Sequence, residues 1–255
     1  MKKQLLTLLL LGAAALVKAQ NPYPILSVDS VQFVNPTKLA TPTANTFPDY
    51  IDPVFRDTVY RDTVRFDGVV VTNPRIYGLS ASRKAAYLQK LGGGPWSGVL
   101  VMCEPNGTGV NLATLNAETK FYENFVPGKL VRVTGVIRHF QGETQINLIR
   151  DNANWTNSIE QLALNDTTVV WHEIAAKELM SGNPNTGWVQ QKQTAEQWEG
   201  APVVLRNVTV YNVTANGANR NNWSVIDDEG NVVEIRDMSG YFSRDDNEDT
   251  IPKIA

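Results

Sequence analysis

The side chains best suited to bind a ligand are aromatic and cationic residues that recur between positions 75 and 140. Aromatic rings offer flat faces on which bases or sugar rings stack, and Lys and Arg can reach phosphates or carboxylates. The residues that we expect to share one binding face are Arg75, Tyr77, Arg83, Lys84, Tyr87, Trp96, Arg138 and Phe140. The alternative stays open: the aromatic rings can equally be core or edge packing, and scattered arginines keep any surface soluble.

Residues that could catalyse a reaction are sparse. The chain has only His139 and His172, and His172-Glu173 is not followed by a second His at zinc-protease spacing. Cys103 is the single cysteine, so a cysteine-based zinc site is excluded. There is no Gly-x-Ser-x-Gly sequence, and the glycines at 92–94 lack the Lys-Ser/Thr of a phosphate-binding loop. We therefore expect no enzyme activity and no cofactor in this stretch, and we expect both histidines to be surface or turn residues.

One spacing of oxygen-bearing side chains resembles a calcium loop, namely Asp245, Asn247 and Asp249. In such a loop the sixth position is glycine, and here it is Thr250, while the twelfth position falls beyond Ala255. A solvated acidic loop is the better interpretation, and this calcium candidate is weak.

The first 19 residues have the pattern of a signal peptide. Two lysines precede an apolar run from Leu5 to Val17, which is too short to span roughly 30 Å of hydrocarbon. The pattern predicts export and a mature chain that starts near Gln20, secreted or at the cell surface, without later membrane insertion. One cysteine allows no internal disulfide, so stability must come from a hydrophobic core.

Charge is unevenly distributed along the chain. Removal of the leader changes the formal charge from −3 to −6. Residues 56–150 carry 12 Lys or Arg against 7 Asp or Glu, whereas residues 221–255 carry 3 against 9. The first region can accept anionic ligands, but it lacks the strongly basic footprint of a dedicated nucleic-acid binder.

The stretch 127–148 predicts a hairpin that organises the rest of the chain. Its apolar and polar residues alternate from Val131 to Arg138, Gly135 interrupts the alternation where a strand of a small barrel would bend, and a turn falls at 140–143. Upstream, Thr63–Thr72 reads as a first strand with a second possible bend at Gly68.

The segment Lys84–Leu91 favours a helix by propensity, but an internal repeat indicates a strand. Pro202–Val213 resembles the first strand, and Trp223–Ile235 is a hairpin with a turn at Glu229-Gly230. When the region that begins at Thr63 is aligned with the region that begins at Pro202, with a shift of one residue, residues 84–91 align with the first strand of that hairpin. We therefore predict strands at 84–91 and 97–103, and a short helix within 112–125.

Three strands, a helix and two strands is the order of the OB fold, so we predict an all-β protein of tandem five-stranded OB-like barrels with few short helices. OB barrels commonly bind ligands on strands two and three and on the loops that join strands one to two and four to five, and this rule selects the eight residues named first.

The segments VRFDGVVVTNP, GGGPWSGVLV, PGKLVRVTGVI and FQGETQI resemble tandem extracellular OB-like domains of large secreted bacterial proteins, of the type exported by the type IX secretion system. The similarity extends over most of residues 25–240 and rests on fold-forming residues. It implies further domains in the same chain, and it implies nothing about activity.

The remaining segments divide the chain into regions. Residues 20–61 form a proline-rich arm in which Ile25–Val34 is either one strand, added to the edge of the barrel, or an extended linker. The first barrel occupies 62–150. A connector over 151–200 has a strand end and a short helix at 169–180, a break at 181–185, and Trp171, Trp188 and Trp198 as buried anchors between domains.

Residues 201–255 predict a second OB-like domain that lacks its closing hairpin, so we expect these residues to belong to a longer protein. The predicted function is a non-catalytic exported binding or spacer module that contacts a polymer, either nucleic acid or glycan, through the first barrel. One alternative is an accessory region of an extracellular nuclease or other hydrolase whose catalytic domain lies beyond Ala255. The other is a purely structural stalk.

Overall fold

The computed structural model describes residues 23–34, 63–76, 83–104, 112–140, 143–149, 158–162, 167–215 and 221–236. The predicted signal peptide, Tyr77 and the calcium candidate Asp245, Asn247 and Asp249 lie outside these ranges. So do the side chains of His139 and Phe140, whose backbone is part of a strand.

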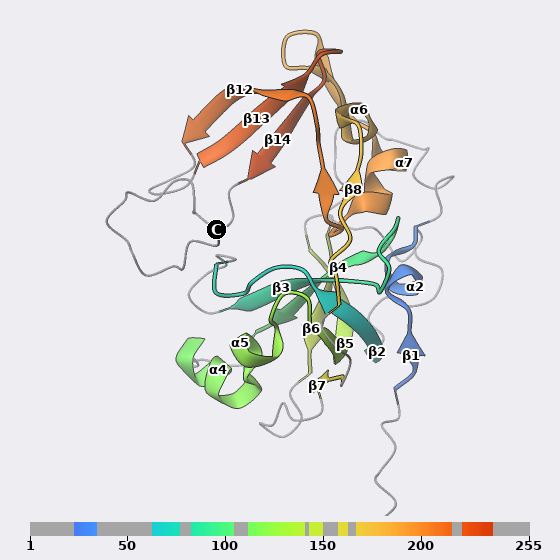
Figure 1. Ribbon diagram of the computed structural model, residues 1–255, viewed down its shortest axis with the longest axis vertical. Coiled ribbons are helices and arrows are strands. Elements are labelled where there is room, and N and C mark those ends of the chain that lie inside the picture. Colours follow the sequence, from blue (N-terminus) through green and yellow to red (C-terminus); the bar gives the residue numbers. More distant parts are fainter. Residues whose placement is uncertain are drawn as a thin grey trace, which may run out of the picture.

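A closed five-stranded barrel forms the first half of the fold (Figure 1). Its strands are β2 (Thr63–Val70), β3 (Lys84–Gln89), β4 (Gly98–Cys103), β5 (Leu130–Phe140) and β6 (Glu143–Leu148). Neighbours pair in the order β2-β3-β4-β6-β5, β4 and β6 are parallel, and the antiparallel pair β2–β5 closes the ring. This connectivity is that of an OB fold, and the predicted strands and closing hairpin are confirmed.

Alternate residues of each strand fill the barrel. Phe66, Leu88, Val101, Val133 and Ile146 are all fully buried in one cluster. Burial of each such side chain stabilises the fold by about 1.5–3 kcal/mol.

Two glycines lie in barrel strands where a neighbouring strand leaves no room for a Cβ atom. A Cβ at Gly135 would overlap the side chain of Ile146, and one at Gly68 would lie 2.9 Å from the Cβ of Leu88. On the outside, Arg132 donates two hydrogen bonds to Asp67 directly across the β2–β5 seam, at 2.6 and 2.8 Å. That contact raises the pKa of the Arg132 guanidinium.

The N-terminal arm contains a short strand and a helix. Strand β1 (Ile25–Leu26) pairs in parallel with β2, and α2 (Val28–Gln32) follows. The single strand predicted over Ile25–Val34 is therefore wrong after Leu26. Val28 and Val31, three residues apart, share one helical face and are buried in the barrel core. The sequence of Ile25–Val34 also alternates approximately between apolar and polar residues, and this pattern led to the prediction of a strand.

Helices α4 (Leu112–Thr119) and α5 (Phe121–Asn124) confirm the helix predicted within 112–125. Lys120 separates them in a left-handed conformation, with φ of 50°. Leu115, Phe121 and Phe125 pack onto the core, and the two phenylalanine rings stack with centroids 4.1 Å apart. Strand β7 (Ile159–Gln161) then pairs with β5.

The connector has more regular structure than the sequence predicted. It contains β8 (His172–Glu173), α6 (Ala176–Leu179), β9 (Met180–Asn183), β10 (Gly187–Gln190), α7 (Lys192–Ala195), a 3₁₀ turn η1 (Glu196–Trp198) and β11 (Val203–Val204). The strand and short helix predicted at 169–180 are present. The break predicted at 181–185 is confirmed, since α6 ends at Leu179, and these positions form part of the β9–β10 hairpin.

The last described unit is a three-stranded antiparallel sheet of β12 (Val208–Ala215), β13 (Asn221–Asp227) and β14 (Val232–Arg236), which lies above the barrel in Figure 1. The predicted turn at Glu229-Gly230 is confirmed. Asp227 accepts hydrogen bonds from the backbone and side chain of Asn231. Although burial opposes ionisation, these bonds and others from the turn lower the pKa of Asp227.

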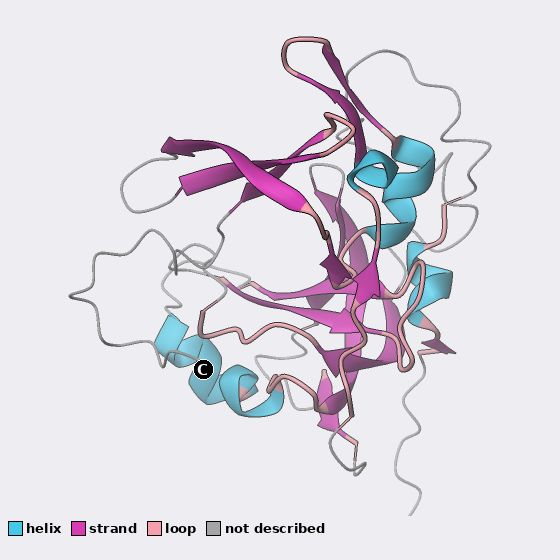
Figure 2. Cartoon of the chain, turned by 45° about the horizontal axis from the view of Figure 1, so that its top comes forward, coloured by secondary structure: helices cyan, strands magenta, loops and turns pink. Residues whose placement is uncertain are grey.

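The architecture is mainly β, with short helices at the margins (Figure 2). Within the ranges given above, no helix combines the length and apolar character needed to cross a bilayer.

Candidate ligand-binding site

The register of the barrel places two of the predicted binding residues in one row. Tyr87 lies opposite Leu100, Leu100 opposite Gln145, and Gln145 opposite Arg138, across β3, β4, β6 and β5. The centre of this outer face is buried, since Leu100 is only 2% exposed and the neighbouring Met102 only 3%. The predicted face therefore exists as a surface of the barrel, but it is not an open platform for a polymer.

Two other predicted residues, Arg75 and Lys84, lie beside helix α5, and a third, Arg83, pairs with a carboxylate. The Lys84 ammonium is 3.3 Å and the Arg75 guanidinium carbon 4.5 Å from the centroid of the Tyr122 ring. Arg83 forms an ion pair with Glu104 at 2.9 Å. Sequence reasoning missed Tyr122, because only the packing of α5 brings it to the start of β3.

Trp96 supports the structure between the N-terminal arm and the connector. It adopts φ of 61°, and its ring meets that of Phe33 edge-on with centroids 5.3 Å apart. Its backbone N–H donates to the carbonyl of Gln197 at 2.6 Å. In this position Trp96 joins three segments of the fold and is not part of the outer row.

The connector contacts the barrel closely. A Cβ on Gly98, at the start of β4, would overlap the backbone of Gly200 and Ala201. The Gln89 side chain exchanges two hydrogen bonds with the backbone of Val170, at 2.8 and 2.9 Å.

His172 makes a further contact between the connector and the barrel. Its Nε2 accepts the Gly94 N–H at 2.7 Å, and its ring lies 5.4 Å from that of Trp198. His172 is partly buried, so the prediction of a simple surface or turn histidine missed a structural contact.

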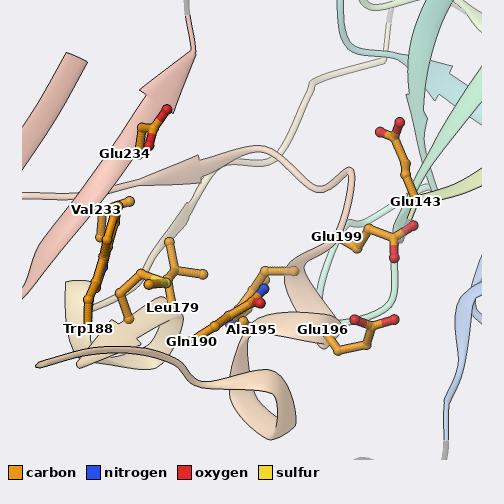
Figure 3. Close-up of a pocket in the computed structure, with 11 residues that line it drawn as sticks. Glu143, Leu179, Trp188, Gln190, Ala195, Glu196, Glu199, Val233 and Glu234 are labelled. Carbon is orange, nitrogen blue, oxygen red and sulfur yellow. The ribbon is translucent and has the colours of Figure 1, made fainter. Parts of the chain in front are cut away.

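A pocket of about 390 Å³ lies where the connector, the barrel and β14 meet (Figure 3). Leu179, Trp188 and Val233 gather on one side, whereas Glu143, Glu196 and Glu199 lie on the other. The full lining is Glu143, Leu179, Met180, Trp188, Gln190, Ala195, Glu196, Trp198, Glu199, Val233 and Glu234. This volume is within the range of small-ligand sites, roughly 300–1,000 Å³.

The tryptophans of the connector have different roles. The Trp188 indole N–H donates to the carbonyl of Val232 at 2.8 Å, which fixes its ring against β14. Trp198 is partly buried against His172, and both Trp188 and Trp198 line the pocket. Trp171 is 61% exposed and Trp188 36% exposed, so the prediction of a buried anchor is wrong for both.

The carboxylates of the pocket are held in place. Glu143 accepts hydrogen bonds from the Tyr87 hydroxyl and from Gln145, and Glu199 accepts the Thr144 N–H at 2.6 Å. Burial raises the pKa of Glu143, and the two hydrogen bonds only partly oppose that effect. Glu234 is exposed and accepts from Asn222 at 2.7 Å.

The lining contains an aromatic and apolar wall, an amide and four carboxylates, with no Lys or Arg. Such a site suits a ligand with an apolar face and hydroxyl or other donor groups. Across the described residues, no three or more His, Cys, Asp or Glu are grouped to hold a metal ion. The residues of this pocket come from β6, the connector and β14, and Trp188 and Trp198 alone were singled out from the sequence.

Comparisons with known proteins found solved structures of low similarity to this chain. No family model matches the chain, and no curated protein matches it. A chain of a replication protein A heterotrimer bound to ssDNA is 13% identical with a TM-score of 0.30, and the match covers 56% of this chain and 82% of that one. An OBody bound to hen egg-white lysozyme is 16% identical with a TM-score of 0.30, covering 49% and 96%.

Proposed function

We propose that this chain is a non-catalytic binding module of an exported protein, and that it holds one or two sugar units of a glycan in the pocket between the barrel and β14. The observation that carries this proposal is the pocket lining, in which Trp188 and Trp198 face a site that also presents Glu143, Glu199 and Gln190. The apolar side of a sugar ring packs on an indole, while its hydroxyl groups donate to carboxylates and exchange hydrogen bonds with an amide.

Between the two polymers considered, the charges of the pocket favour a glycan. Phosphate backbones are bound through Lys and Arg, and the lining has neither. Glu143, Glu196, Glu199 and Glu234 would repel a phosphate chain at this place. The ssDNA of the replication protein A structure belongs to that protein, and the low TM-score lends it no weight here.

The hydrogen bonds of the carboxylates preorganise the pocket for binding. Glu199, from the connector, accepts a backbone N–H of the barrel, whereas Glu143 is held within the barrel by the Tyr87 hydroxyl. The leader pattern of residues 1–19 supports export, and the resemblance to tandem extracellular domains supports a place in a larger secreted protein.

The test is titration of residues 20–255 with neutral oligosaccharides and, separately, with single-stranded DNA, followed by tryptophan fluorescence and calorimetry. Trp188→Ala should weaken saccharide binding by about tenfold, because truncation of an aromatic contact residue at a binding site typically costs more than about 1 kcal/mol. Trp171→Ala is the matched control, since Trp171 is exposed and lies outside the lining. Gln190→Ala, which removes no core packing, should also weaken binding.

Two results would overturn the proposal. One is the absence of saturable binding to any neutral saccharide, which would leave the stalk as the function. The other is saccharide binding that Trp188→Ala and Trp171→Ala reduce equally. Circular dichroism of each variant ensures that a loss of binding is not a loss of folding.

A further inference from the structure

We infer that Arg75, Lys84 and Tyr122 form a second binding site, separate from the pocket, which takes a single oxyanion group such as phosphate or sulfate. Two cations lie over one aromatic ring, with the Lys84 Nζ 3.3 Å and the Arg75 Cζ 4.5 Å from its centroid. Three elements build this arrangement: the segment after β2, the first residue of β3, and helix α5.

The Lys84 ammonium is the first part of the argument. Lys84 is 2% exposed, and its Nζ has no hydrogen-bond partner. Burial of a charged group is costly unless another group compensates it, and the Tyr122 ring supplies only part of that compensation. The site therefore holds a positive charge that solvent screens little and that no described side chain neutralises.

The nearby carboxylates are engaged elsewhere. Glu104 pairs with Arg83 at 2.9 Å and also accepts from Asn147, and Glu123 accepts hydrogen bonds from Asn116 at 3.2 and 3.3 Å. Among the described residues, the Arg75 side chain has the contact with Tyr122 and no ion pair. These described carboxylates therefore do not balance the charge of this site, and an anionic ligand can do so.

Arg75 and Lys84 differ in solvent exposure, and so they have different roles in this site. Arg75 is exposed, so its planar guanidinium can make the direct, bidentate contact with an oxyanion. Lys84 is buried beside the same ring and adds attraction through a medium of low dielectric constant. The site lies at the Lys84 end of β3, whereas the connector contacts the Gln89 end, so it is independent of the sugar pocket.

The experiment titrates residues 20–255 with sodium sulfate and with sodium phosphate at constant ionic strength, using sodium chloride as the reference, and follows ¹H–¹⁵N spectra and the melting temperature. Sulfate and phosphate should shift the Arg75 side-chain and Tyr122 signals saturably. Arg75→Ala should weaken this binding about tenfold, the equivalent of one charge-assisted contact. Lys84→Met should weaken it as well, by a smaller factor.

Arg138→Ala is the control, because Arg138 is also exposed, has no ion pair among the described residues, and lies on the outer row away from Tyr122. Equal losses in Arg75→Ala and Arg138→Ala would show general charge attraction and overturn the inference. So would shifts that chloride reproduces at the same ionic strength. If Lys84→Met fails to fold, sulfate binding by the Arg75→Ala variant still tests the inference, because Arg75 is exposed.

Two polymers then identify the source of the oxyanion. A single-stranded oligonucleotide that displaces sulfate from Arg75 identifies a phosphate source, and a sulfated oligosaccharide that does so identifies a glycan source. Sulfate binding that persists in Trp188→Ala supports two independent sites. If sulfate does not bind at all, this inference fails, while the proposal of a sugar pocket is unaffected.

Discussion

The Tyr87 hydroxyl donates a hydrogen bond to the Glu143 carboxylate, and this bond joins β3 to β6 across the intervening strand β4. Glu143 also lines the pocket, so the same carboxylate belongs to the outer face of the barrel and to the candidate sugar site. Ionisation of Glu143 is therefore linked to both stability and binding.

We predict that Glu143→Gln makes stability less dependent on pH. Burial raises the pKa of Glu143 in the folded state above its usual value of 4.5. The folded state therefore holds the proton more tightly than the unfolded state, and stability falls as pH rises from that usual value through the raised one. Glutamine keeps a carbonyl for Tyr87 and removes the titration.

Urea denaturation between pH 4 and 7, a range chosen around the usual glutamate pKa, would measure this difference. The variant should lose less free energy of unfolding than the wild type over that interval. Glu234→Gln is the control, since Glu234 lines the same pocket but is exposed. If the free energy of unfolding depends on pH equally in the wild type and in Glu143→Gln, the prediction is contradicted.

We predict that His172→Phe destabilises the contact between the connector and the turn that follows β3. Phenylalanine retains an aromatic ring beside Trp198 but leaves the Gly94 N–H without its acceptor, which costs about 1–3 kcal/mol. His172→Ala removes the ring as well and should cost more. Chemical denaturation gives the free energies, and faster amide exchange at Gly94 would locate the effect. Unchanged exchange at Gly94 in both variants would count against this role.

We predict that Gly98→Ala separates the connector from the barrel. Its new methyl group would overlap the backbone of Gly200 and Ala201, which cannot rotate away as a side chain can, so the cost should reach about 1–3 kcal/mol or more. Ser97→Ala is the neighbouring control, because the Ser97 hydroxyl is buried without a hydrogen-bond partner and its loss should be neutral or stabilising. Calorimetry and protease sensitivity at 190–201 measure the effect; a wild-type melting temperature for Gly98→Ala would refute it.

The barrel was predictable because its signals are local. Alternation over 130–148 identified one strand pair, and the hairpin pattern of 223–235 identified another, which also served as the guide for the strands at 84–103. Helix α2 was not predicted, since a five-residue helix is stabilised by tertiary contacts of Val28 and Val31 and not by propensity. The β9–β10 hairpin was hidden by a turn in which Gly182 and Gly187 adopt positive φ, which reads from sequence as a loop.

The candidate sites were less predictable, because each is assembled from distant segments. The OB rule selected Tyr87 and Arg138, which lie in one row of the sheet, but it could not show that Leu100 and Met102 are buried at the centre of that face. Glu143 comes to the pocket from β6 and Glu199 from the connector, and no spacing in the sequence relates them.

Helix α2 also has a consequence for anyone who produces this barrel as a recombinant domain. Its valines complete the core, and the Gln32 side chain donates to the Gly98 carbonyl, on the strand that the connector crosses. A gene boundary placed at the first barrel strand would look natural in a sequence alignment, yet it would remove part of the interior. Expression should therefore begin upstream of Ile25, so that the arm is synthesised with the barrel that it completes.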